Sequence, residues 1–216
     1  MKKFGLMMIG AILLFMLTGC RQEPECFDEI LYIYERIARG ESTIADIEQQ
    51  RHNLKEREKE LRGPIIQGGA DSNLAVLSYI EETMESIRSR QNLVGEQIRI
   101  MGEKKEELES AALLIESIEN EEIKEKFLQV QLLHGERYET FIRWSDYYLE
   151  TTREEIRFYT LLQEDEQNLQ DLENITIELN QRAMTEGQLQ ESLSEVSVRL
   201  NGAINALARA LERREV

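Results

Sequence analysis

Several features on which other protein classes depend are scarce or missing in this sequence. Only two prolines, Pro24 and Pro64, occur among its 216 residues. No stretch alternates apolar and polar residues as a half-buried strand requires. Because Glu, Gln, Leu, Arg and Ala are abundant and no proline follows Pro64, the composition favours long helices and argues against a sheet.

Recognisable catalytic and metal-binding motifs are also missing. The two histidines, His52 and His134, lack metal-ligand spacing, and we expect both to be ordinary helix residues. No serine has a nucleophile-elbow context, and no glycine-rich loop is suited to hold a phosphate. Carboxylates occur throughout, so a catalytic pair cannot be distinguished from a solvated helix face. We therefore predict a protein that is not an enzyme and binds neither a cofactor nor a metal.

Positive charge is in short supply. The chain has 26 basic and 42 acidic residues, which gives a formal net charge of −16. A chain this acidic is repelled by nucleic acid and by anionic surfaces unless divalent cations or local basic patches intervene. The charge therefore predicts no nucleic-acid partner.

The chain begins with an apolar segment that follows two positive charges. Lys2 and Lys3 precede the apolar residues 4–17, a run too short to span a bilayer but suited to a signal peptide. The next residues, Leu17-Thr18-Gly19-Cys20, resemble the lipobox of bacterial lipoproteins. An alternative is an uncleaved anchor helix, or an ordinary secretory signal followed by a chance cysteine.

The lipobox resemblance implies cleavage before Cys20 and attachment of a diacylglycerol to its thiol. Two acyl chains, at about 0.8 kcal/mol for each buried CH₂, hold a protein stably on a membrane. We therefore predict a lipoprotein signal peptide over residues 1–19, a lipid-anchored tether over 20–26 and a helical domain over 27–216. With Cys20 lipidated, Cys26 has no partner for a disulfide, so the fold must depend on packing.

Apolar periodicity predicts a series of helices separated by short breaks. Gly40 is expected to end the first helix, and "RGPIIQGGADSN" (62–73) is the clearest loop. Asn120 is expected to cap a new helix after a reversal at 119–122, whereas residues 163–168 could form a turn or continue the helix. The predicted helices cover residues 24–39, 43–62, 71–119, 121–163 and a last segment that carries Leu169 to Leu211.

The third helix has the strongest pattern, because steps of three and four residues alternate over more than five heptads. Such a seam is typical of a coiled coil and needs neighbouring helices. Its interruptions, Gln91 and Lys105, could set register or partner choice, and Gly95 and Gly102 beside it suggest a close helix approach. We predict an all-α, elongated antiparallel helical bundle or coiled-coil rod. The seam residues are Leu77, Ile80, Met84, Ile87, Gln91, Val94, Ile98, Met101, Lys105, Leu108, Ala112 and Ile115.

Aromatic residues are concentrated in "RYETFIRWSDYYLETTREEIRFYTLLQ" (137–163). Phe141, Trp144 and Tyr148 share one helix face, which favours a place in the core, whereas Tyr147 lies off that face. A second interpretation is that aromatic rings beside carboxylates stack on sugar rings. On that interpretation Trp144, Tyr147 and Tyr148 are candidate ligand-binding residues.

Taken together, these segments resemble the YkyA-type cell-wall-binding lipoproteins of Gram-positive bacteria. The resemblance covers Cys20, the opening "EILYIYERIA", the middle helices and the aromatic stretch, in which Tyr138, Tyr148 and Tyr159 are the spaced positions. It implies a non-enzymatic protein anchored by lipid to the outer face of the cytoplasmic membrane, where it binds peptidoglycan or another envelope component. The alternatives are a cell-surface scaffold that acts through coiled-coil contacts and, without a supporting motif, an envelope hydrolase.

Overall fold

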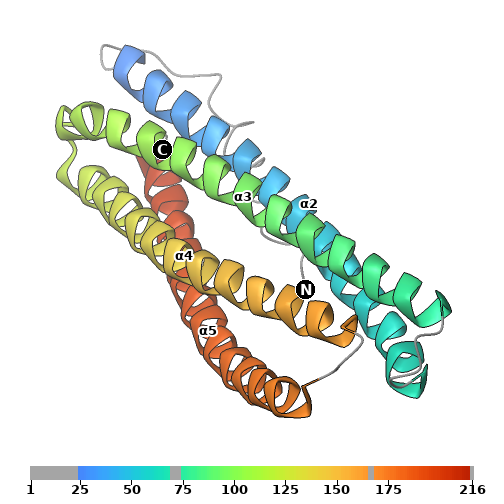
Figure 1. Ribbon diagram of the computed structural model, residues 1–216. Helices are drawn as coiled ribbons and strands as arrows, with labels where there is room; N and C mark the ends of the chain where they lie inside the picture. Colours follow the sequence, from blue (N-terminus) through green and yellow to red (C-terminus); the bar gives the residue numbers. More distant parts are fainter. Residues whose placement is uncertain (1–23, 69–73, 165–167, 215–216) are drawn as a thin grey trace. The chain divides into compact units, whose positions relative to one another are not determined.

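The computed structural model describes residues 24–68, 74–164 and 168–214, which form four helices and no strand (Figure 1). The predicted all-α helical bundle is therefore confirmed. The predicted signal peptide and Cys20 lie outside the described residues. The helices are α2 (Pro24–Gly68), α3 (Leu74–Glu116), α4 (Glu121–Leu162) and α5 (Leu169–Arg214).

The helices pack as two compact units, and every helix contributes one part of its length to each unit. Unit 1 comprises Met1–Ile44, Arg99–Phe141 and Ser192–Val216, and unit 2 comprises Ala45–Ile98 and Ile142–Glu191. Consecutive helices run in opposite directions, so each unit contains four antiparallel helical stretches.

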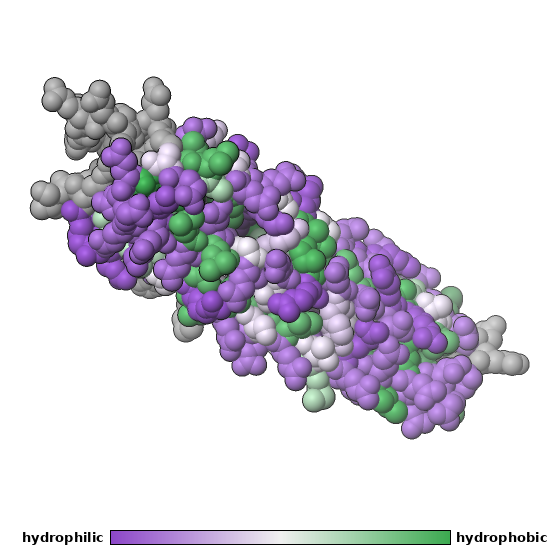
Figure 2. Space-filling view, turned by 90° about the vertical axis from the view of Figure 1, so that its left-hand side faces the viewer, coloured by the Kyte–Doolittle hydropathy of each residue, from purple (hydrophilic) through white to green (hydrophobic). Residues whose placement is uncertain are grey.

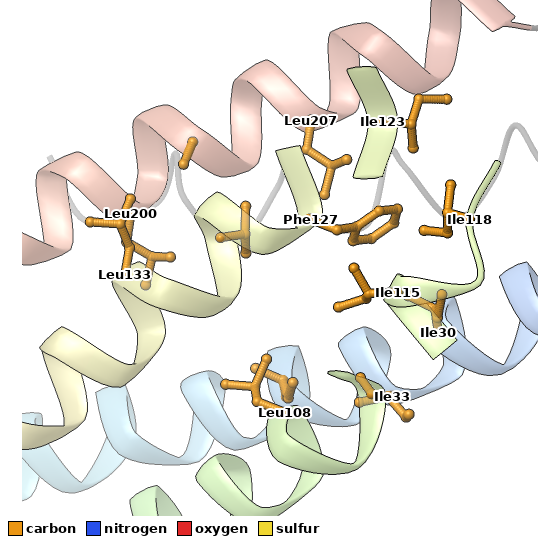
Figure 3. Close-up of a cluster of buried hydrophobic side chains, with 14 of the residues drawn as sticks. Ile30, Ile33, Leu108, Ile115, Ile118, Ile123, Phe127, Leu133, Leu200 and Leu207 are labelled. Atoms are coloured by element: carbon orange, nitrogen blue, oxygen red, sulfur yellow. The ribbon is translucent and has the colours of Figure 1, made fainter. Parts of the chain in front are cut away.

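Unit 1 has an apolar core to which all four helices contribute (Figure 3). On α2 the buried residues Ile30, Ile33 and Ile37 are spaced by three and four, so they lie on one helix face. They meet a layer centred on Phe127 of α4, which is 1 % exposed. The other buried members are Leu108, Ala111, Ile115, Ile118, Ile123, Val130, Leu133, Leu200, Ala203, Leu207 and Ala210.

Unit 2 has a smaller apolar cluster, which comes from α2, α3 and α4 only. In this unit α5 contributes one buried residue, Ile175, whereas Leu169 and Met184 of the same stretch are exposed. The fourth helical stretch of unit 2 must therefore be held mainly by other contacts. The cluster members are Leu61, Ile65, Val76, Ile80, Met84, Ile87 and Tyr159.

The ends of α4 and α5 follow the capping chemistry expected from the sequence. Asn120 Oδ1 accepts a hydrogen bond from the Ile123 N–H at 3.1 Å, which confirms the predicted cap after the reversal. Asn168 Oδ1 accepts from the Gln170 N–H at 3.1 Å and so caps α5 in the same way. Because α4 ends at Leu162 and α5 begins at Leu169, the helix does not continue through 163–168.

The predicted break at Gly40 was wrong, since α2 is continuous there, and the predicted loop at 62–73 begins too early, since α2 extends to Gly68. At Gly40 an added Cβ would lie 3.0 Å from Lys104 Cδ, so this glycine permits a close side-chain approach and does not end a helix. Pro64 lies in the last part of α2 with its ring exposed, while its neighbours Leu61 and Ile65 are buried in the unit 2 cluster. That burial stabilises helical geometry where the local sequence favours a loop.

The seam of α3 was predicted correctly on one side, whereas on the other side Met84 is buried and the remaining predicted positions are half-buried. Ile80, Ile87, Val94, Met101, Leu108 and Ile115 are all buried, as expected. The second buried row, however, is shifted by one residue from the prediction, and its middle is polar. The row repeats every seven residues: Val76, Thr83, Arg90, Gln97, Lys104, Ala111 and Ile118.

The interruptions of the seam make contacts to α4, and the glycines beside the seam do not mark a close approach. Gln91 and Lys105 are half-buried, and Gln91 donates to Thr152 Oγ1 at 3.0 Å, while the Lys105 ammonium lies 5.2 Å from the Tyr138 ring. An added Cβ on Gly95 or Gly102 would meet nothing within 4 Å, so the predicted close approach there was wrong.

One face of the molecule is drawn by hydropathy in Figure 2. The face drawn in Figure 2 shows hydrophilic side chains predominating, with apolar residues in small separate patches. Within residues 24–68, 74–164 and 168–214, no helix combines the length and the hydrophobicity that a membrane crossing requires.

Candidate functional site

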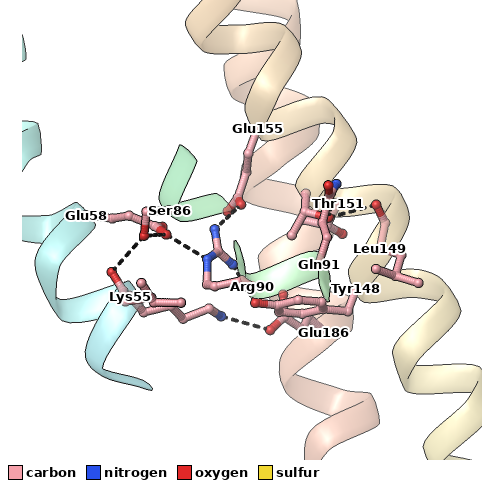
Figure 4. A network of polar contacts seen from close by, with 12 residues as sticks. Lys55, Glu58, Ser86, Arg90, Gln91, Tyr148, Leu149, Thr151, Glu155 and Glu186 are labelled. Atoms are coloured by element: carbon pink, nitrogen blue, oxygen red, sulfur yellow. Dashed lines mark hydrogen bonds and ion pairs between the residues drawn. The ribbon is translucent and has the colours of Figure 1, made fainter. Parts of the chain in front are cut away.

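Arg90 of α3 lies at the centre of a buried polar network in unit 2 (Figure 4). Its side chain is 1 % exposed, and its guanidinium donates to Glu58 Oε1 at 2.8 Å, to Tyr148 Oη at 2.5 Å and to Glu155 Oε2 at 2.5 Å. Ser86 Oγ also donates to Glu58 Oε1, at 2.8 Å. One cation thereby links α2, α3 and α4.

The surroundings of Arg90 keep it charged despite its burial. Burial alone would lower the pKa of Arg90, but the attraction of Glu155, Tyr148 and Glu58 outweighs it and raises the pKa. Burial also raises the pKa of the Tyr148 hydroxyl, against the opposing effect of Arg90. The network therefore consists of a fixed cation, two carboxylates and a neutral phenol.

An aromatic layer, stacked with cations, lies beside this network. The Arg51 guanidinium lies 4.4 Å from the centroid of the Trp144 ring and 5.1 Å from that of Tyr148. The Lys55 ammonium lies 5.1 Å from the Tyr148 ring. Arg51 and Lys55 are four residues apart on α2, as Trp144 and Tyr148 are on α4, so each pair lies on one helix face.

Contacts from α5 complete this layer. Lys55 Nζ donates to Glu186 at 3.2 Å (Figure 4). The Arg182 guanidinium lies 5.6 Å from the ring of Tyr147 and pairs with Glu178 at 2.9 Å. We call Arg51, Trp144, Tyr147, Tyr148 and Arg182 the aromatic–guanidinium cluster.

Arg51 differs from the other cations of this region. Arg90, Lys55 and Arg182 each pair with a carboxylate. In the part of the chain that the structure describes, Arg51 has no carboxylate within ion-pair distance, and its Nη1 is buried without a hydrogen-bond partner. Burial lowers the pKa of Arg51. Such a guanidinium can donate hydrogen bonds to a ligand carboxylate. Of the three aromatic rings in the cluster, the half-buried Tyr147 is the one that a sugar could reach.

Unit 1 contains a second buried charged group, centred on Glu41 of α2. Glu41 accepts hydrogen bonds from Lys104 of α3 and from Arg137 of α4, with Arg137 Nη2 at 3.0 Å from Glu41 Oε2. Burial alone would raise the pKa of Glu41, but the attraction of the two cations outweighs it and lowers the pKa to about 2. One carboxylate therefore pairs with two cations, which leaves a positive surplus.

Burial lowers the pKa of Lys104 and of His134, which lie near Glu41. It lowers the pKa of Lys104 to about 8, and the repulsion of Arg137 adds to this effect while Glu41 opposes it. It also lowers the pKa of His134 to about 3, again with a contribution from Lys104. His134 is thus neutral near pH 7.

The three candidate ligand residues lie in one cluster, but they differ in how far their side chains are exposed. Trp144 is 3 % exposed and Tyr148 1 %, which confirms the core interpretation of these two rings, whereas Tyr147 is half-buried. A ligand-binding role for any of the three stays a prediction. The charged stretch 51–62, which contains Arg51, could be noted in the sequence as a possible contact for an anionic polymer or as a solvated face, whereas Arg90 and its pair to Glu155 were missed.

No metal site accompanies these clusters in the described ranges, because no three His, Cys, Asp or Glu side chains there gather closely enough to hold an ion.

The fold and the cluster define a helical-bundle protein with cations and aromatic rings gathered in one unit. Residues 27–209 match a family model described as "Putative cell-wall binding lipoprotein". The chain therefore belongs to the YkyA family, as the sequence resemblance implied. No curated protein and no solved structure matches it.

Proposed function

We propose that this protein is a non-enzymatic envelope lipoprotein that binds peptidoglycan through the aromatic–guanidinium cluster of unit 2. The observation that carries the proposal is the family match over residues 27–209. The cluster supports it because peptidoglycan offers sugar rings and peptide carboxylates, which suit Tyr147 and Arg51 respectively.

Net charge makes the local cations important for this proposal. Removal of residues 1–19 leaves 24 basic and 42 acidic residues, a formal charge of −18. Such a chain is repelled by anionic wall polymers at long range, so binding must depend on short-range contacts or on divalent cations. Arg51 supplies a cation whose charge is not already balanced by a direct ion pair.

Co-sedimentation with purified wall sacculi tests this function. The fragment 21–216 is centrifuged with sacculi in the presence and absence of Mg²⁺, and we expect it to pellet with them. If the fragment stays in the supernatant under both conditions, direct wall binding is wrong. Recovery of one envelope protein by crosslinking in cells would instead support the scaffold alternative.

Matched variants test whether the cluster makes the contact. Arg51→Met and Tyr147→Ala are each expected to reduce pelleting about tenfold, which corresponds to about 1.4 kcal/mol. Arg88→Met and Tyr32→Ala are the controls, because both side chains are exposed and lie outside the cluster. Equal losses in variants and controls would exclude the cluster as the binding surface.

We further propose that Cys20 carries the lipid that holds the protein at the extracytoplasmic face of the membrane. The lipobox resemblance and the family description support this anchor. Labelled palmitate should enter the wild-type chain but not Cys20→Ser, and the variant should leave the membrane fraction. A Cys20→Ser chain that still fractionates with membranes would contradict the proposal.

A further inference from the structure

Unit 1 contains a cavity of about 250 Å³ between α2, α4 and α5. Protein interiors are normally close-packed, and an apolar cavity of about 150 Å³ already binds a small hydrocarbon. On α2 the lining extends from Leu31 to Glu41, which is about 15 Å at 1.5 Å per residue. The cavity is thus long enough for an aliphatic chain of moderate length.

Most of the lining is apolar. Phe127 contributes from α4 and Leu200 and Leu207 from α5, and all three belong to the buried cluster drawn in Figure 3. Ala208 lines the same cavity, and its small side chain leaves space beside α5. This part of the cavity suits a hydrocarbon tail and offers it no charged group.

One end of the cavity is polar and carries a surplus of positive charge. Glu41, Arg137 and the neutral His134 line it, and Lys104 pairs with Glu41 from α3. Two cations around one carboxylate leave a net charge of +1. Glu35 also lines the cavity and pairs with Arg39 at 3.7 Å, so these two charges balance each other.

Two buried donors along this cavity lack partners. Arg137 directs Nη1 and Nη2 to Glu41, but its Nε has no hydrogen-bond partner, and neither does the hydroxyl of Tyr34. An unsatisfied buried donor costs about 1–3 kcal/mol, so each needs an acceptor. An anionic head group offers hydrogen-bond acceptors and is attracted to a local positive charge.

We propose that this cavity binds a monoanionic amphiphile with a single aliphatic chain, with its head group at Arg137 and its tail among Phe127, Leu200 and Leu207. The head group supplies acceptors to Arg137 and screens the surplus charge of the Glu41 group. The tail removes apolar lining from water. This binding is separate from the wall contact proposed for unit 2, because every lining residue belongs to unit 1.

Photo-crosslinking tests the proposal on the full chain in phosphatidylcholine vesicles. The probe is decanoate with a diazirine in its tail, and mass spectrometry identifies the labelled residues. We expect labelling at Phe127, Leu200 or Leu207, with decanoate competing at least tenfold better than decanol or decyltrimethylammonium. A second arm uses lysophosphatidylglycerol with the diazirine in its single acyl chain, and it distinguishes a phospholipid from a free fatty acid.

Two tryptophan substitutions on α5 provide the matched comparison. Ala208→Trp should fill the cavity and reduce labelling about tenfold, whereas Ala183→Trp, at an exposed position in unit 2, should not change it. Arg137→Gln should abolish the preference for decanoate over decanol and keep the tail contacts. Circular dichroism at 222 nm checks that each variant is folded.

Three outcomes would overturn the proposal. The first is the absence of cavity labelling by either probe. The second is equal labelling of Ala208→Trp and the wild type, and the third is a wild-type chain that does not distinguish decanoate from decanol. None of these results would affect the sacculus assay, so failure here is distinguishable from failure of wall binding.

Discussion

The two units bury charge in opposite proportions. In unit 2 one cation, Arg90, lies between the carboxylates of Glu58 and Glu155, whereas in unit 1 one carboxylate, Glu41, lies between two cations. A central charge with two partners can be buried because its desolvation is offset on both sides. The surplus charge is negative around Arg90 in unit 2 and positive around Glu41 in unit 1.

The same helix, α5, is also held differently in the two units. In unit 1 it buries Val196, Leu200 and Leu207 together with three alanines, whereas in unit 2 it buries Ile175 alone. There Leu172, Leu179 and Leu189 are only half-buried, and ion pairs join Lys55 to Glu186 and Arg182 to Glu150. Full apolar burial is extensive in the first attachment and slight in the second, where partly exposed ion pairs contribute, so the responses of the two attachments to mutation should differ.

The largest effect is expected for Arg90→Met, which leaves two carboxylates close together without their cation. Removal of one member of a buried charged group typically costs about 3–5 kcal/mol of unfolding free energy. Urea unfolding followed by circular dichroism measures it. The control is Arg88→Met on the same helix, where an exposed pair to Glu85 should contribute less than about 1 kcal/mol. Equal losses in both variants would show that Arg90 is not central to unit 2.

Arg90 also shows why half of the α3 pattern escaped sequence analysis. The row that includes Ile80 and Val94 is apolar throughout, and so periodicity alone located it correctly. The other row has polar residues in its middle, and their burial depends on partners such as Glu58 and Glu41 from α2. No pattern within α3 reports those partners. The available signal was the seven-residue spacing of Arg90, Gln97 and Lys104 next to the seam.

The candidate site was found in part for a similar reason. Aromatic residues are conspicuous in sequence, so Trp144, Tyr147 and Tyr148 could be singled out. Arg51 is one of many charged residues on α2, and its position over the Trp144 ring follows from how α2 packs on α4. Gly40 was misassigned because a glycine that ends a helix and one that admits a neighbouring side chain look the same in sequence.

A comparison of two leucines on α5 sharpens the contrast between its attachments. Leu200→Ala in unit 1 removes a side chain that is 3 % exposed and should cost about 2–5 kcal/mol of unfolding free energy. Leu189→Ala in unit 2 removes a half-buried side chain and should cost less than half as much. Thermal or urea unfolding of both variants gives the two values. A larger loss for Leu189→Ala would contradict the view that polar contacts hold α5 in unit 2.

The two histidines allow the two units to be compared by the pH dependence of stability, because His134 lies in unit 1 and His52 in unit 2. The pKa of His134 in unit 1 is lowered to about 3, whereas an unfolded histidine titrates near 6.5. Between these values the unfolded state binds more protons, so stability falls as the pH falls. From about pH 6.5 to about pH 5 the loss from this group should approach about 2 kcal/mol.

Substitution of each histidine isolates this contribution. His134→Gln should remove that part of the acid loss, because glutamine does not titrate. His52→Gln should leave it unchanged, because His52 has an exposed side chain. Urea unfolding at several pH values between about 5 and 7 measures both variants. A His134→Gln chain with the wild-type pH dependence would show that His134 is protonated in the folded state.

The smallest effect on stability is expected for Arg182→Met, yet it tests the attachment of α5 most directly. Arg182 pairs with Glu178 at 2.9 Å and with Glu150 at 3.6 Å, and it covers the Tyr147 ring. Loss of these partly exposed contacts should cost less than about 1 kcal/mol, which corresponds to about two- to fivefold faster amide hydrogen exchange in residues 169–191.

Arg199→Met is the matched control for this last experiment. Arg199 pairs with Glu136 at 2.6 Å, but its stretch of α5 is held by the apolar core of unit 1. Its loss should therefore leave exchange in residues 192–214 nearly unchanged, because the apolar contacts remain. Exchange that accelerates equally in both variants would mean that ion pairs hold α5 in the same way throughout, and the distinction between the two attachments would have to be abandoned.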